Sequence, residues 1–215
     1  VLPYLKRGLI NQIKDYKYRY PLPNFNSKHK KYNIIDCGAN IGDFTLSFIE
    51  KYPNSKIFSF EPSPNEFSVL QKNTLKYDNI ECFNTALGES SKEAEFYIST
   101  DTADSSLIEP AFYTKKITVK VKKLDDFYKD INIKTIDLIK IEAEGGEPEV
   151  LLSGKNILKN TKFVSVDWGP ERGIEEENTL NKVSNILFAL NFEMVVCYDK
   201  NYTVLFKNKS FKDID

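Results

Sequence analysis

The sequence has few of the residues that build metal centres, disulfide frameworks and membrane spans. It contains one His, one Met, one Trp and three Cys among 215 residues. Three cysteines are too few for a disulfide framework, which favours a reducing compartment such as the cytoplasm. No stretch of about 18 consecutive apolar residues occurs, so we expect no membrane-spanning helix. No dense spacing of His, Cys, Asp and Glu is visible, so we expect no metal site.

The sequence also lacks an excess of charge of either sign. Its 30 Lys and Arg residues are balanced by 31 Asp and Glu residues, and the formal net charge is −1. A balanced charge provides no excess of positive charge that would attract a polyanion. We therefore expect no nucleic-acid partner.

The length of the chain allows one full α/β domain with a substantial core. Residues 1–31 are polar and aromatic, and we expect them to form an N-terminal covering segment over a main domain at 32–215. The chain begins with Val1 rather than Met and has no signal-peptide layout, so we expect it to be part of a longer protein.

Strand-like and helical patterns alternate from Tyr32 onward, which is typical of a parallel sheet covered on both faces. The predicted fold is α/β and Rossmann-like: a doubly wound, mostly parallel, seven-stranded sheet with an antiparallel last strand, and a small β insertion around 93–123. We expect main-sheet strands at residues 33–37, 56–61, 80–85, 136–141, 163–166, 193–198 and 202–207, and helices near 41–52, from Ser63, at 148–154 and near 180–190.

The most informative stretch is residues 34–44, where an apolar run leads into Asp-x-Gly-x-x-x-Gly and then a helical pattern. This order predicts a buried strand, a tight turn and a helix N-terminus that together bind a ligand. Asp36, Gly38, Asn40 and Gly42 are the predicted pocket residues. The loop lacks G-x-G-x-x-G, and the acid suits a positively charged ligand better than a phosphate. The alternative is that Asp36 and Asn40 serve only the turn.

A second acid, Glu61, ends the strand-like run 56–61. In dinucleotide-binding folds an acid about 20 residues beyond the glycines binds a ribose hydroxyl. A carboxylate suits this task because it only accepts hydrogen bonds. We therefore predict a ribose-bearing ligand such as S-adenosylmethionine, whose amino and sulfonium groups match the acid at Asp36. The alternative for Glu61 is an exposed strand end.

Five blocks of the sequence, in this order, resemble those of the FkbM family of class I S-adenosylmethionine-dependent methyltransferases. The blocks are residues 35–42, 60–62, 84–88, 124–127 and 139–147. The resemblance implies S-adenosylmethionine as cofactor and methylation of hydroxyl groups, often on sugars or natural products. One position differs, because the family usually has Lys-x-Asp-x-Glu-Gly and this sequence has Glu142 at the Asp position. The longer side chain moves the carboxylate outward by one methylene.

The acids that follow the 136–141 strand form a second predicted site, facing the methyl group. Glu142 and Glu144 share a face if the chain is extended, and close carboxylates raise one pKa, which suits a proton acceptor. Glu142 is our first choice for a base or hydroxyl orienter, Glu144 the second, and Lys140 would hold either carboxylate. The alternative is an ion-paired loop. With Asp167, these acids also offer oxygen ligands to Mg²⁺ or Mn²⁺.

Asp167 and Trp168 follow the next strand, at the same edge of the sheet. Asp167 is predicted to accept a hydrogen bond from the acceptor hydroxyl, and Trp168 to stack on a sugar ring. The alternative is a core Trp beside an N-capping Asp. Glu147 is predicted only to favour the dipole of the following helix.

The resemblance also implies roles for several residues other than these acids. Pro62 is assigned to the cofactor site together with Glu61, and Ala86 and Leu87 match the stretch that lies beside the adenine. Ser105 and Ser106, in the insertion, match a Ser position near the substrate.

The leading hypothesis is an O-methyltransferase for a carbohydrate or another hydroxylated small molecule, fused to glycosyltransferase domains in a longer glycan-building enzyme. The alternatives are an N-methyltransferase of protein or nucleic acid, a non-catalytic interaction module and an NAD-dependent oxidoreductase. The missing Asn/Asp-Pro-Pro-Tyr signature disfavours the first alternative, the intact Asp36 and Glu61 disfavour the second, and the missing G-x-G-x-x-G turn disfavours the third.

Overall fold

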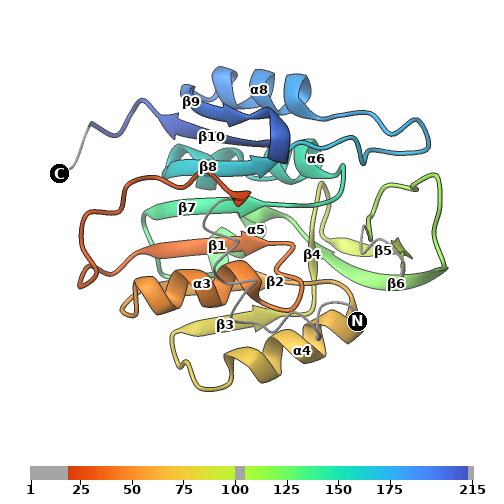
Figure 1. The fold of residues 1–215 in the computed structure, drawn as a ribbon, viewed down its shortest axis with the longest axis horizontal. Helices are drawn as coiled ribbons and strands as arrows, with labels where there is room; N and C mark the ends of the chain where they lie inside the picture. Colours follow the sequence, from red (N-terminus) through yellow and green to blue (C-terminus); the bar gives the residue numbers. More distant parts are fainter. Residues whose placement is uncertain (1–18, 100–104, 213–215) are drawn as a thin grey trace.

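The core of the molecule is a seven-stranded sheet (Figure 1). The computed structural model describes residues 19–99 and 105–212. The strand order is β3-β2-β1-β7-β8-β10-β9. The strands are β1 (Asn33–Cys37), β2 (Lys56–Phe60), β3 (Ile80–Phe83), β7 (Ile136–Ile141), β8 (Thr161–Asp167), β9 (Phe192–Tyr198) and β10 (Thr203–Asn208).

Strands β3, β2, β1, β7 and β8 are parallel, and β10 is antiparallel to both of its neighbours, β8 and β9. The predicted α/β class, seven strands and antiparallel last strand are therefore confirmed. Strand β7 is buried along its whole length because it lies near the middle of the sheet with helices on both sides.

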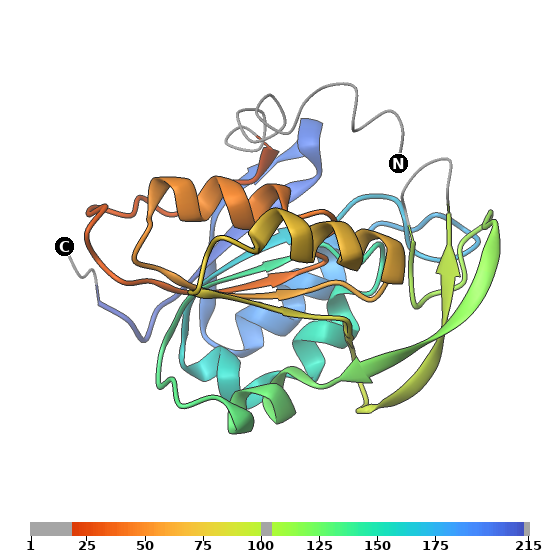
Figure 2. The same ribbon diagram turned by 90° about the horizontal axis from the view of Figure 1, so that it is seen from below.

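Helices cover both faces of this sheet (Figure 2). Helices α3 (Asp43–Lys51) and α4 (Pro64–Thr74) lie on one face, and α5 (Leu124–Asp130), α6 (Glu147–Leu152), α7 (Lys155–Lys159) and α8 (Leu180–Ala189) lie on the other. Phe44, Phe48 and Ile49 of α3 pack in one core cluster, while Leu151 and Leu187 of α6 and α8 pack in the other. The parallel strands thus end at one open edge between two helical layers.

Two predicted helix ends differ from the structure. The helix expected at 148–154 is α6, which ends at Leu152, and Gly154 directly precedes the separate helix α7 rather than closing a helix. Ser63 precedes α4 as expected, but its hydroxyl bonds the Glu66 carboxylate instead of a backbone N–H. At Ser63 the Glu66 carboxylate thus competes with the backbone for the hydroxyl group.

The predicted β insertion supplies two strands, β5 (Lys92–Ile98) and β6 (Lys115–Lys122), of a separate three-stranded sheet in the order β4-β6-β5. Its third strand, β4 (Ala86–Leu87), lies before the predicted insertion. Alternation along β5 and β6 places Phe96, Ile98 and Val121 in a small apolar cluster. Residues 100–104 of the predicted insertion lie outside the described residues. This sheet stands beside the open edge of the main sheet (Figures 1 and 2).

The described part of the predicted covering segment, residues 19–31, packs against the main domain. Tyr20 is buried, with its ring edge toward Phe44, and Phe25 packs on Phe48. Residues 1–18 lie outside the described residues, and the domain boundary at residue 32 stays a prediction. Within the described ranges, none of the helices has the length and apolar character needed to cross a membrane.

Candidate active site

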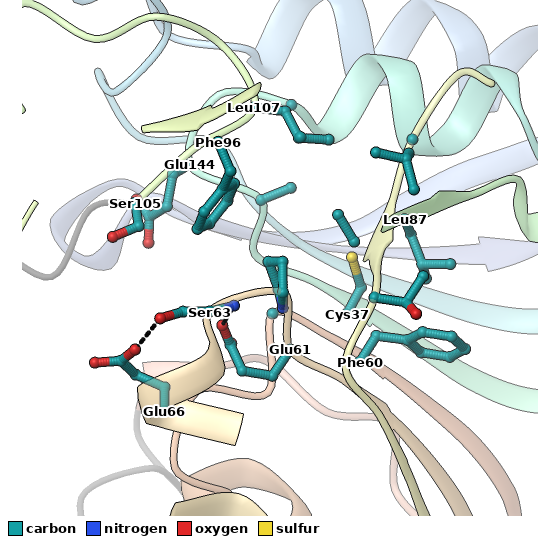
Figure 3. Close-up of a pocket in the computed structure, with 18 of the residues that line it drawn as sticks. Cys37, Phe60, Glu61, Ser63, Glu66, Leu87, Phe96, Ser105, Leu107 and Glu144 are labelled. Atoms are coloured by element: carbon teal, nitrogen blue, oxygen red, sulfur yellow. Dashed lines mark hydrogen bonds between the residues drawn. The ribbon is translucent and has the colours of Figure 1, made fainter. Parts of the chain in front are cut away.

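A cavity of about 700 Å³ opens where the carboxyl ends of β1, β2 and β7 meet the apolar face of the small sheet (Figure 3). This volume is within the range of small-molecule sites, about 300–1,000 Å³. The sequence-predicted residues that line it are Gly38, Asn40, Glu61, Pro62, Ala86, Leu87, Ser105, Glu142 and Glu144. Those that do not line it are Asp36, Gly42, Ser106, Lys140, Asp167 and Trp168.

The glycine loop after β1 forms one wall of the cavity. The N–H groups of Gly38 and Ala39 donate to the carbonyl oxygen of Phe60, at 3.1 and 2.9 Å. Gly38 has a φ of 74°, and a Cβ atom there would collide with the carbonyl oxygen of Glu142. Only glycine combines a readily adopted positive φ with the absence of a Cβ atom, so Gly38 lets the loops after β1 and β7 approach each other.

Glu61 ties the glycine loop to the start of α4. Its Oε2 accepts the N–H of Asn40 and its Oε1 accepts the N–H of Ser63, each at 2.8 Å. Burial raises the pKa of Glu61 to about 7, even though these two hydrogen bonds act to lower it. Each carboxylate oxygen has a further lone pair for a ligand hydroxyl. The side chain lines the cavity, as Figure 3 shows.

Asp36 is paired inside the protein rather than directed into the cavity. Its side chain is fully buried, Thr45 Oγ1 donates to Oδ2 at 2.6 Å, and Lys140 Nζ lies 3.2 Å from Oδ1. The positive charge beside Asp36 in this structure is therefore a lysine of the chain itself. The sequence could not reveal this pair because β1 and β7 are distant in the chain and adjacent in the sheet.

Glu142 lies between two cations. Its carboxylate is 2.8 Å from Lys140 Nζ and 2.6 Å from Arg19 Nη2. Burial acts to raise the pKa of Glu142, but the charges of Lys140 and Arg19 outweigh it and lower this pKa to about 2. Glu144 has left-handed backbone geometry, with a φ of 48°, and is not in extended chain. The prediction that paired carboxylates raise the pKa is thus wrong for Glu142.

Asp167 lies beside this group, outside the cavity wall. The Tyr20 hydroxyl donates to its Oδ2 at 3.4 Å, and Arg19 Nη2 is 3.8 Å from the same oxygen. Burial and the charge of Glu142 raise the pKa of Asp167 to about 7. Trp168 packs edge-to-face on Tyr202, with ring centroids 5.1 Å apart, which matches the alternative of a structural Trp.

Ser105 and Glu144 lie together in the cavity wall, next to the Phe96 ring (Figure 3). The Ser106 side chain is directed away from the cavity, and its hydroxyl donates to the carbonyl oxygen of Glu144 at 2.7 Å. Phe96 and Arg19 also line the cavity and were not predicted from the sequence. Alternation in β5 was the available signal for Phe96, whereas nothing near Arg19 in the sequence indicates its long-range contact with Glu142.

The fold, with the glycine loop, Glu61 and acidic loop around one cavity, defines a class I methyltransferase. The chain belongs to the methyltransferase FkbM domain family, whose model matches residues 36–194. This class uses S-adenosylmethionine, so the chain is an S-adenosylmethionine-dependent methyltransferase. The predicted family and enzyme class are confirmed.

Relatives and solved structures agree with this assignment. The chain is 24% identical over 183 residues to the 2-O-methyltransferase NoeI of Sinorhizobium fredii, covering 78% of this chain and 74% of that protein. It is 26% identical over 135 residues to the hexuronic acid methyltransferase AglP of Haloferax volcanii, covering 62% and 54%. An FkbM methyltransferase structure from Methylobacillus flagellatus superimposes with a TM-score of 0.57 at 16% identity, covering 90% of this chain and 50% of that one.

Proposed function

We propose that the protein transfers a methyl group from S-adenosylmethionine to a hydroxyl group of a sugar or a related metabolite. The observation that carries this proposal is the position of Glu61 and the acidic residues Glu142 and Glu144 on the wall of one cavity. Two relatives, NoeI and AglP, are named as a 2-O-methyltransferase and a hexuronic acid methyltransferase, which favours a hydroxylated sugar as the class of acceptor.

The cavity residues fit the proposed cofactor. Glu61 would accept the ribose hydroxyls through its remaining lone pairs, and Ala86 and Leu87 would lie beside the adenine. Gly38 and Asn40 would border the methionine part, where the missing Cβ of Gly38 leaves the loop close to β7. The cofactor supplies a methyl group already activated by the positive sulfonium, so the protein contributes orientation and exclusion of water.

Glu142 is proposed to orient the acceptor hydroxyl and receive its proton. With a pKa of about 2 it is ionised at neutral pH and can accept a hydrogen bond. A carboxylate of low pKa is a weak base toward a neutral alcohol, but an oxygen that gains a methyl group becomes strongly acidic. Proton transfer to Glu142 therefore accompanies methyl transfer and does not precede it. Lys140 and Arg19 hold this carboxylate from two sides.

The acceptor is proposed to lie against Phe96, Ser105 and Glu144. The three residues border the same part of the cavity (Figure 3). An aromatic ring covers the apolar face of a sugar while neighbouring polar groups bond its hydroxyls. In this proposal Phe96, and not Trp168, stacks on the sugar ring.

A panel of monosaccharides, uronic acids and glycolipids, incubated with methyl-labelled S-adenosylmethionine, tests the proposal. We expect label in a methyl ether of at least one sugar, and turnover by E142Q at least ~100-fold lower, within the range of about 10²–10⁴ for a lost proton acceptor. Label found only on nitrogen or protein would refute sugar O-methylation. Unchanged turnover by E142Q would refute the role of Glu142 alone.

A further inference from the structure

The backbone of the loop of residues 142–146, between β7 and α6, is hydrogen-bonded by side chains from other parts of the fold. It carries both Glu142 and Glu144 into the cavity wall. It contains two residues with positive φ, Glu144 at 48° and Gly145 at 89°. Left-handed geometry is uncommon for a residue with a side chain and persists only where neighbouring groups hold it.

Glu147, the first residue of α6, makes two of these hydrogen bonds. Its Oε1 accepts the N–H groups of Ala143 and Gly145, both at 3.0 Å. Its Oε2 accepts the hydroxyl of Thr179 at 3.0 Å, from the residue that precedes α8. The side chain is 1% exposed and does not line the cavity, so no ligand reaches it. Its carboxylate therefore ties the loop to the start of α8.

Two further side chains hold the carbonyl groups of the same loop. Ser106, from the β insertion, donates to the Glu144 carbonyl at 2.7 Å. Arg172 donates to the Gly145 carbonyl at 2.5 Å and makes a two-bond ion pair with Glu149 at 2.7 and 2.8 Å. Among these three side chains, only Glu147 binds the loop at two backbone N–H groups, because its Oε1 accepts from the residues on both sides of Glu144.

We propose that Glu147 is a positioning residue for methyl transfer, which sets the direction of the Glu142 and Glu144 side chains by holding the N–H groups of Ala143 and Gly145. The inference rests on the proposed function of the acidic loop. It goes beyond the helix-dipole role predicted from the sequence, because the carboxylate also turns back over the loop. Catalytic groups need this support, since a displacement of about 1 Å costs up to ~100-fold in rate.

The substitutions E147Q and E147M test the proposal. The amide oxygen of Gln still accepts both N–H groups, and its NH₂ donates to Thr179 Oγ1, whereas Met has a similar length and no acceptor. NMR of the free protein measures hydrogen exchange at Ala143 and Gly145, and calorimetry measures binding of S-adenosylhomocysteine. Turnover is measured with the panel sugar that the wild type methylates fastest.

For E147M we expect exchange at least ~10-fold faster at both amides and kcat ~100-fold lower, with the Kd for S-adenosylhomocysteine within ~3-fold of wild type. We expect E147Q to match wild type within ~3-fold in amide exchange, in kcat and in the Kd for S-adenosylhomocysteine. The inference is overturned by wild-type exchange and kcat in E147M, by losses in E147Q equal to those in E147M, or by an equal loss of cofactor affinity in E147M. If the wild type labels no sugar, the proposed function fails, while the exchange rates still decide whether Glu147 holds the loop.

Discussion

Removing the Glu61 carboxylate should abolish most of the affinity for the cofactor. Glu61 is 7% exposed, and each of its oxygens already accepts one backbone N–H at 2.8 Å. Two ribose hydroxyls would add two hydrogen bonds to a charged group, each worth about 1.5–3 kcal/mol. Loss of about 3 kcal/mol weakens binding ~100-fold, since about 1.4 kcal/mol corresponds to a factor of ten.

Calorimetry with S-adenosylhomocysteine compares E61A with wild type, and thermal melting checks that both are folded. E81Q is the matched control, because Glu81 lies on the neighbouring strand β3, is paired with Lys56 and does not line the cavity. We expect wild-type affinity for E81Q. A folded E61A that binds within ~5-fold of wild type would refute the ribose-binding role.

Three other changes follow from the same geometry. Only the ionised form of Glu61 accepts both ribose hydroxyls, and the pKa of Glu61 is raised to about 7. Cofactor affinity measured by calorimetry should therefore fall ~10-fold between pH 8 and pH 6. In E61Q this dependence of affinity on pH should disappear. K140M leaves the buried Asp36 carboxylate without its cation and Glu142 with Arg19 alone, at a cost of about 3–5 kcal/mol. The melting temperature should therefore drop by roughly 6–20 °C, and a drop under about 2 °C contradicts this. F96A should raise the acceptor KM ~10-fold with unchanged cofactor affinity, and unchanged sugar kinetics would remove Phe96 from the acceptor site.

Much of the fold could be predicted because local patterns and topology agree in this chain. The apolar run into Gly38, the acid at Glu61 and the antiparallel end of the sheet are each encoded within about ten residues, where hydrophobic periodicity and turn chemistry are informative. The small sheet was also visible, because strict alternation at 117–122 indicates a strand with one covered face.

The electrostatics of the site could not be predicted, because they depend on pairs that are distant in the sequence. Spacing suggested that Glu142 and Glu144 act on each other, whereas Lys140 and Arg19 set the charge state of Glu142. Arg19 is 123 residues from its partner. Trp168 followed a strand in the expected place, but its ring packs on Tyr202 rather than entering the cavity.

Strand β10 follows β9 along the chain and yet lies between β8 and β9 in the sheet. Until residues 203–208 have been synthesised, β9 has no neighbour and the outer edge of β8 is unpaired. The region that matches the family ends at residue 194, inside β9, and so omits the strand that joins this hairpin to the sheet. The outer part of the sheet can therefore be completed only once residues 203–208 have joined it, and loss of this strand would expose two strand edges to intermolecular pairing.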